Sequence, residues 1–174
     1  MPHSPVFKDP RRLHRTRLLR SASTFYKAVI INVNSDDEIE QISLSLALYA
    51  ERIGDMAPFV YERFFELDKN AKALMEYSDE HMRGRMFASV LELFMSDEHL
   101  DAGGYLDWEL ENHLRAYGAT PAMYETFFKS VVTTLAEGLG DDWTENSRQA
   151  WRDRLARITE HVKVHESRLS NFKA

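Results

Sequence analysis

Apolar residues recur at helical spacing along most of the chain, and no strict alternation of apolar and polar residues extends beyond a few positions. The segments that carry this spacing are 35–54, 57–68, 78–95, 105–118, 120–140 and 144–169, with a short piece at 69–77. Residues three and four apart lie on one side of an α-helix, so each segment predicts a helix with one apolar side. The predicted fold class is therefore all-α.

Residues at the segment ends support this interpretation. Thr120 and Pro121 form a pair typical of a helix cap and first turn, and Gly54 follows the helix predicted before it. Gly84 lies inside the 78–95 segment, where glycine costs about 1 kcal/mol relative to alanine. It indicates either a tolerated weak point or a close crossing with another helix.

The first part of the chain differs from the rest in charge. Residues 1–34 carry seven Lys or Arg and one acid, so the net charge of −6 for the whole chain leaves about −12 for the remainder. Apolar residues within 11–30 are spaced for one or two helices, and an amphipathic helix is favoured over a targeting segment. We expect a basic N-terminal extension, 1–35, and one folded domain, 36–174.

The composition excludes several classes of chemistry. The chain has no Cys, which excludes disulfides and thiol nucleophiles and is typical of a reducing compartment, so a cytoplasmic location is expected. The rest of the chain, beyond residue 34, is acidic and is therefore expected to bind nucleic acid poorly. The longest apolar runs are far shorter than the roughly 18 residues of a membrane span, and none is predicted.

His113 is the main candidate for chemistry among the seven histidines, because it combines an apolar helix side with a nearby helix end. Its spacing is compatible with a buried core residue, a catalytic base or a metal ligand. His161 and His165 are four residues apart and could hold a metal, but they lack a third ligand nearby and are predicted to face solvent. Glycine-rich phosphate loops and serine nucleophile motifs are absent from the sequence.

Two segments resemble bacterial single-domain globins and the globin part of flavohaemoglobins. "FVYERFFELDKNAKALM" at 59–75 is similar to the family's second helix and following corner, and "HLRAYGATPAMY" at 113–124 is similar to its proximal histidine, link and next helix. The chain beyond Tyr124 is similar to the last two helices. The likeness spans residues 36–170 and implies a globin-like fold with an additional N-terminal helical extension.

The resemblance implies that His113 holds the iron of haem b. It also implies a network of His113, Tyr124 and Glu166, in which the imidazole is polarised by its partners. Two departures from the family pattern are visible. Met75 stands where a phenylalanine packs against haem, and the link from His113 to Tyr124 is one residue longer than in the family.

On the other side of the haem, the resemblance places Tyr61 as the distal tyrosine. If Gly84 lies at the tight crossing, Arg83 and Phe87 lie over the iron. A slip of one residue would place Met82 and Met86 there instead. The first register is preferred, and Arg83 would then be near a bound anion or a haem propionate.

The implied function is reversible binding of oxygen, nitric oxide or carbon monoxide. Nitric oxide dioxygenase activity would follow only with an external reductase, because the sequence holds no flavin or nicotinamide domain. The alternative is a sensor or interaction module similar to globin-coupled sensors, with or without haem, acting through homodimer or partner contacts of the extension and last helix. An unrelated helical bundle with a packed His113 is the third interpretation.

Overall fold

The computed structural model describes residues 36–97 and 105–171, and all of the regular structure in that part is helical. Its elements are α2 (Asp36–Arg52), α3 (Ala57–Leu67), α4 (Lys69–Leu74), α5 (Glu80–Met95), α6 (Tyr105–Asn112), the π-helix η2 (His113–Tyr117), α7 (Pro121–Leu139), the short 3₁₀ helix η3 (Gly140–Asp142) and α8 (Glu145–Asn171). The predicted all-α class and globin-like fold are confirmed. The helix predicted within 1–35 lies outside the described residues.

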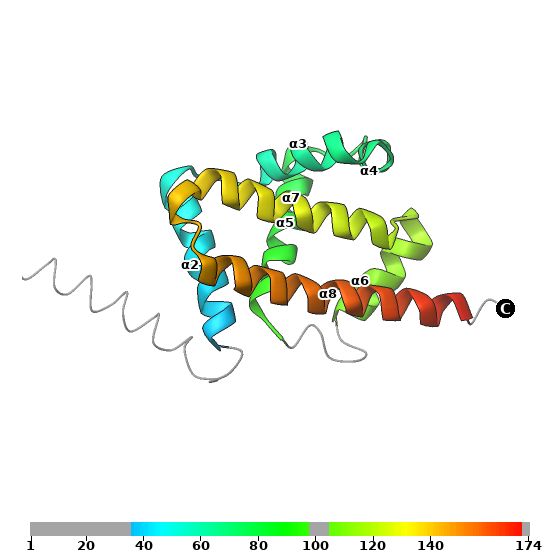
Figure 1. Cartoon of the computed structure of the whole chain (residues 1–174). Coiled ribbons are helices and arrows are strands. Elements are labelled where there is room, and N and C mark those ends of the chain that lie inside the picture. Colours follow the sequence, from blue (N-terminus) through cyan, green and yellow to red (C-terminus); the bar gives the residue numbers. More distant parts are fainter. Residues whose placement is uncertain (1–35, 98–104, 172–174) are drawn as a thin grey trace, which may run out of the picture. The chain divides into compact units, whose positions relative to one another are not determined.

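The two longest helices, α7 and α8, run antiparallel and are joined by the tight turn at η3 (Figure 1). Helix α3 packs along α7, α5 contacts α3, and α6 packs against α8. The core forms where these helices meet. Its fully buried large side chains include Val60, Phe94, Leu110, Val131, Leu135, Trp151, Ile158 and Val162.

Helix starts are fixed by side-chain caps. The Asp68 carboxylate accepts hydrogen bonds from the backbone N–H groups of Asn70 and Ala71, and the Asp79 carboxylate accepts one from Met82. Thr120 caps α7 through its hydroxyl, as its place before Pro121 predicted. The caps thus set the two helices, α5 and α7, that carry most of the candidate site residues.

Helices α2 and α7 come very close together at Gly138 of α7. A Cβ atom at Gly138 would lie 2.7 Å from Cδ1 of Ile53 and closer still to the Tyr49 ring, so α2 approaches the α7 backbone where only glycine fits. A Cβ at Gly84 would meet nothing within 4 Å. The close crossing considered for Gly84 is therefore wrong, because its side of α5 is open rather than packed on another helix.

Two polar side chains of α8 are buried in the core. The indole N–H of Trp151 donates to the Ser45 hydroxyl at 2.9 Å, which joins α8 to α2. Arg154 has no exposed side-chain area and donates to the backbone carbonyl of Leu93, at 2.8 Å, and to that of Ser96. It also pairs with Asp97. Arg154 therefore holds the last turn of α5 against α8.

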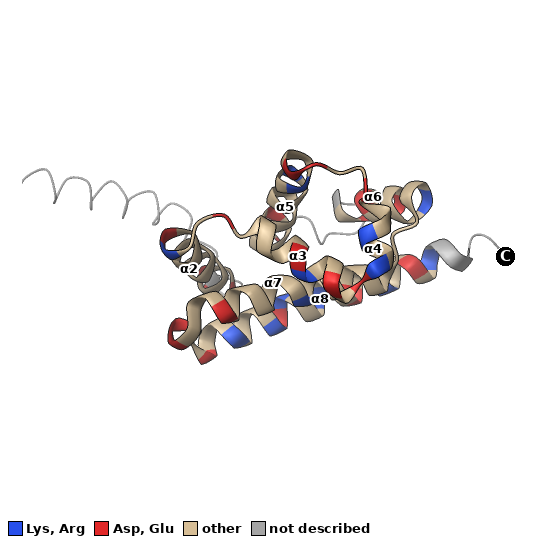
Figure 2. Cartoon of the chain, turned by 90° about the horizontal axis from the view of Figure 1, so that it is seen from above, with Lys and Arg blue, Asp and Glu red and all other residues tan. Residues whose placement is uncertain are grey.

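Acidic and basic positions are interspersed along α8 (Figure 2). Among the described residues, no helix is both long enough and apolar enough to cross a membrane.

Candidate functional site

His113 begins a single π-helical turn at the end of α6. Its carbonyl accepts hydrogen bonds from the backbone N–H groups of both Gly118 and Ala119. Gly118 has φ +73°, the left-handed conformation that glycine adopts most readily, and it ends the helix. A π turn accommodates one residue more than an α turn. The π turn therefore places one more residue between His113 and the end of the helix than an α turn would.

The imidazole of His113 is joined to α7 by Tyr124. The distance from Nδ1 to the Tyr124 hydroxyl oxygen is 2.8 Å. Thr120 caps α7, so Tyr124 lies one turn into that helix and faces the end of α6. Burial raises the pKa of Tyr124, and the nearby Glu109 carboxylate raises it further, so the hydroxyl stays neutral. Two predicted residues, His113 and Tyr124, are thus brought together.

The carboxylate beside this pair is Glu109, where the sequence analysis expected Glu166. Glu109 Oε2 lies 3.2 Å from Nε2 of His113. Glu166 is half-buried, and within the described chain it forms no hydrogen bond or ion pair with His113 or Tyr124. The signal for Glu109 was in the sequence, because residues four apart on a helix lie on one side. The resemblance implied Glu166 instead.

Tyr61 lies on α3 with 4% of its area exposed. Its ring centre is 5.4 Å from that of Phe127 and 5.8 Å from that of Phe65. Burial raises the pKa of Tyr61 to about 12, although the charge of Arg83 opposes part of that rise. No hydrogen bond of the Tyr61 hydroxyl is found among the described residues, so this group remains available for another molecule.

Helix α5 presents Arg83 and Phe87 toward the same cluster. The guanidinium carbon of Arg83 is 6.0 Å from the centre of the Tyr61 ring, and Phe87 is buried edge-on to Phe127 with centres 6.3 Å apart. Met82 and Met86 are 42% and 36% exposed. The contacts therefore favour the register with Arg83 and Phe87 beside Tyr61, even though the tight crossing at Gly84 that motivated it does not exist.

Met75 caps the end of α4 and is half-buried against the core. The Met75 backbone N–H bonds to the Ala71 carbonyl at 3.0 Å, and the Met75 carbonyl accepts from the Ser78 hydroxyl at 2.7 Å. These bonds hold it in the corner between α4 and α5. A role in contacting haem stays a prediction.

Helix α7 connects the two groups of candidate residues. Tyr124 and Phe127 are three positions apart, so they lie on neighbouring parts of one helix side. The first contacts His113, and the second contacts both Tyr61 and Phe87. An imidazole and an unpaired phenol are consequently placed around a shared aromatic wall.

A third cluster joins α6 to α8. The Asp107 carboxylate lies 2.6 Å from Nε2 of His161 and 3.1 Å from Nδ1 of His165, and all three side chains are mostly buried. The prediction that His161 and His165 face solvent is wrong, because packing of α6 on α8 covers them. The sequence carried no local signal for Asp107, which lies 54 positions before His161.

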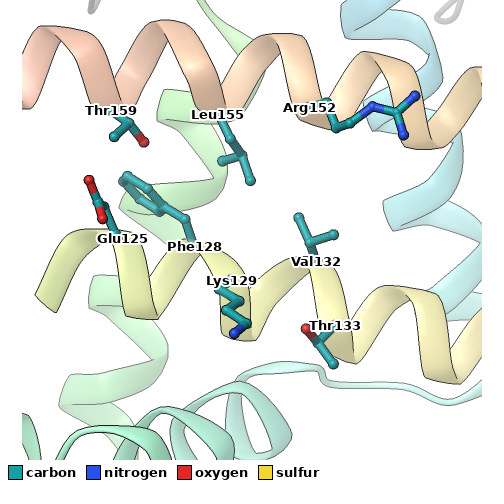
Figure 3. A pocket seen from close by; sticks show the side chains of 8 residues that line it. All are labelled: Glu125, Phe128, Lys129, Val132, Thr133, Arg152, Leu155 and Thr159. Atoms are coloured by element: carbon teal, nitrogen blue, oxygen red, sulfur yellow. The ribbon is translucent and has the colours of Figure 1, made fainter. Parts of the chain in front are cut away.

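Within the described part of the chain, no three His, Asp or Glu side chains form a group suited to a metal ion. A separate groove of about 350 Å³ lies between α7 and α8, with Phe128, Val132 and Leu155 along it and Glu125 and Arg152 at opposite ends (Figure 3). The groove does not include His113 or Tyr61.

Comparison with known proteins gives one family. Residues 85–162 match the globin family model, a segment that begins within α5, ends within α8 and includes His113 and Tyr124. Neither curated proteins nor solved structures provide a match. The match spans 78 of the 174 residues and, with the helical architecture, supports a globin-like fold for this chain.

Proposed function

We propose that this chain binds haem b through His113 and uses it to bind a diatomic gas reversibly. The observation that carries the proposal is the hydrogen bond between Nδ1 of His113 and the Tyr124 hydroxyl. A ligating histidine almost always has its second nitrogen held by such a partner, which fixes the ring and its tautomer.

The surrounding residues fit a haem group. The His113 side chain is 32% exposed, so its ring is accessible to a ligand. The aromatic wall of Phe87, Phe127 and Tyr61 offers apolar contacts for a porphyrin face. When bound, haem supplies an iron with a free coordination position that oxygen, nitric oxide or carbon monoxide can occupy.

The chain's own residues have distinct roles in this proposal. His113 provides the iron ligand, and Tyr124 orients it. Tyr61 donates a hydrogen bond toward the gas, because its side chain is buried and its hydroxyl is neutral and has no hydrogen bond within the described chain. Arg83 supplies a positive charge beside Tyr61. Affinity measurements with each gas would identify the one that is bound, and nitric oxide dioxygenation would require electrons from an external reductase.

The direct test is a titration of the purified full chain with haemin. We expect a Soret band that saturates at one haem per chain, with shifts on reduction and on addition of carbon monoxide. A chain that stays without a saturable Soret band would reject the proposal.

Tyr61→Phe is expected to raise the rate of oxygen dissociation from the reduced, loaded chain about five- to tenfold. The change removes one hydrogen bond worth about 1 kcal/mol, and the buried ring is retained. Because the pKa of Tyr61 is about 12, the hydroxyl stays protonated between pH 6 and 9, so its effect should be constant over that range. Displacement of oxygen by carbon monoxide in a stopped-flow instrument measures the rate.

The matched control is Tyr77→Phe, since the Tyr77 ring is 93% exposed. It should leave the dissociation rate unchanged. Equal oxygen dissociation rates for wild type and Tyr61→Phe would show that Tyr61 donates no hydrogen bond to the gas. They would not contradict haem binding by His113.

A second candidate function, a module that acts as a homodimer, is favoured by the groove between α7 and α8. Its apolar side chains lie between an acid end, Glu125, and a basic end, Arg152 (Figure 3). Within one chain Glu125 pairs with Lys163 and Arg152 pairs with Glu145, and a two-fold axis across this surface would bring these two ends of the groove together between copies. Sedimentation of the full chain at micromolar concentration tests the idea, and a monomer would reject it.

A further inference from the structure

Helix α6 leads directly into His113 but is too short to fix its own position. It has eight residues, Tyr105–Asn112, whereas isolated helices shorter than about 12–15 residues are marginally stable in water. Its position therefore depends on contacts with other helices. Leu106 and Leu110 are buried in the core, but apolar burial is non-directional and does not by itself fix the rotation of a helix.

A directional contact joins α6 to α8 through Asp107. The Asp107 oxygen Oδ1 is hydrogen-bonded to Nε2 of His161 at 2.6 Å and lies 3.1 Å from Nδ1 of His165. The Asp107 side chain is 15% exposed, against 25% for Glu109 and 45% for Glu111, so it is the most buried acid of α6. Because a hydrogen bond has a preferred length and angle, this contact limits both the rotation of α6 and its slide along α8.

The cluster is shielded from water, and it differs from an ordinary apolar contact. Nε2 of His165 is buried and has no hydrogen-bond partner within the described residues. A buried polar atom without a partner lowers stability, and an apolar side chain at position 165 would avoid that loss. Packing alone therefore does not explain why polar groups join α6 to α8 here.

The other end of α6 is held by His113, whose Nδ1 lies 2.8 Å from the Tyr124 hydroxyl oxygen on α7. Asp107 and His113 are six residues apart, which is about 9 Å along a helix axis and about 240° around it. The two contacts therefore lie near different ends and on different sides of the helix. A helix held at two such points cannot rotate without breaking one of them.

We propose that Asp107 is a positioning residue for His113, because its contact with α8 fixes α6 and so keeps the imidazole at Tyr124. The inference rests on the proposed function for the role of His113 as an iron ligand. The placement of the His113 ring, however, is a property of the protein that can be measured without haem.

The first experiment measures the nuclear Overhauser effect between the rings of His113 and Tyr124 in the full chain without haem. The two ring centres are 6.3 Å apart. Asp107→Ala should weaken this signal and speed hydrogen exchange of the α6 amides about tenfold or more, because the hydrogen bond of a carboxylate is lost. Asp107→Asn should stay within about threefold of wild type, because the side-chain oxygen of Asn can still accept from His161.

Two variants serve as controls. Trp151→Phe removes the buried hydrogen bond to Ser45, which is 2.9 Å long and joins α8 to α2, so it weakens α8 packing away from α6. Glu111→Ala removes an acid of α6 together with its pair at 3.0 Å to Arg115. Both should leave the signal between the His113 and Tyr124 rings unchanged.

His161→Ala removes the same hydrogen bond from the α8 side, so it tests the proposal even if Asp107→Ala does not fold. It should weaken the signal between the His113 and Tyr124 rings as well. A signal as strong as that of wild type in His161→Ala and in folded Asp107→Ala would overturn the inference. An equal loss in Trp151→Phe would also overturn it, because the effect would then be general destabilisation.

The second experiment uses the haem-loaded chain. In Asp107→Ala the iron–imidazole stretching band of the ferrous form should shift or broaden in resonance Raman spectra, and haem dissociation should be about three- to tenfold faster. Asp107→Asn and Trp151→Phe should keep the wild-type band. An unchanged band in Asp107→Ala would overturn the inference and leave the proposed function standing. If the chain binds no haem, the proposed function fails, and the signal between the two rings still decides whether Asp107 positions His113.

Discussion

His113→Ala is expected to raise the dissociation constant for haem more than about 100-fold and to remove the Soret band of the loaded chain. Loss of a residue that merely holds a ligating histidine costs about 10- to 100-fold in metal affinity, so loss of the ligand itself should cost more. The His113 side chain is one-third exposed, and the free energy of unfolding should change by about 1 kcal/mol or less. Haemin titration and urea unfolding measure the two quantities.

His81→Ala is the control, because His81 is exposed on α5. His161 and His165 are already bonded to Asp107, which leaves His113 as the described histidine with both an accessible ring and an anchored nitrogen. His113→Gly leaves room for free imidazole, which should restore a Soret band. A variant at position 113 that binds haem as tightly as wild type would place the iron ligand elsewhere.

The helices were predictable because their signals are local. The 120–140 segment was expected to begin after Thr120, and α7 spans Pro121–Leu139 with the Thr120 hydroxyl bonded to a backbone N–H. Apolar spacing and cap residues act within a few turns, so neither depends on distant parts of the chain. The fold class then follows from an unbroken series of such segments.

The helix crossings were not predictable from the same signals. Gly84 and Gly138 both lie inside apolar helical patterns, yet only Gly138 has another helix against its backbone. Which glycine lies at a crossing depends on how α2 lies across α7, and periodicity within one helix carries no such information. The cluster of Asp107 with two histidines was missed for the same reason.

The residues of the candidate site were likewise predictable only in part. The resemblance assigned His113 and Tyr124 by position, and the structure places them in hydrogen-bond contact. It also assigned Glu166, but α8 does not bring that carboxylate to the pair in the described residues, and Glu109 lies there instead. A motif fixes where a residue stands in the chain. Which carboxylate reaches an imidazole depends on helix rotation and on the π turn at His113.

Arg154→Ala is expected to lower the free energy of unfolding by about 3–5 kcal/mol, the largest stability effect predicted for this chain. The side chain is fully buried, and its removal leaves a cavity in α8's contact with α5. It also leaves the carbonyls of Leu93 and Ser96 without this donor. Asp97 contributes less to the loss, because its side chain is 46% exposed and stays solvated.

Two further variants separate these causes by urea unfolding. Arg154→Met fills much of the volume without donating a hydrogen bond, so it should lose about 2–3 kcal/mol, the cost of buried carbonyls that lack a partner. Arg152→Ala removes a half-exposed arginine on the same helix, paired with Glu145 at 2.8 Å, and should change stability by about 0.5 kcal/mol or less. Equal midpoints for Arg154→Ala and Arg152→Ala would show that the end of α5 does not depend on the buried guanidinium. Methionine fills much of the space of arginine but donates no hydrogen bond. A loss for Arg154→Met as large as that for Arg154→Ala would therefore assign the effect to the missing hydrogen bonds rather than to packing.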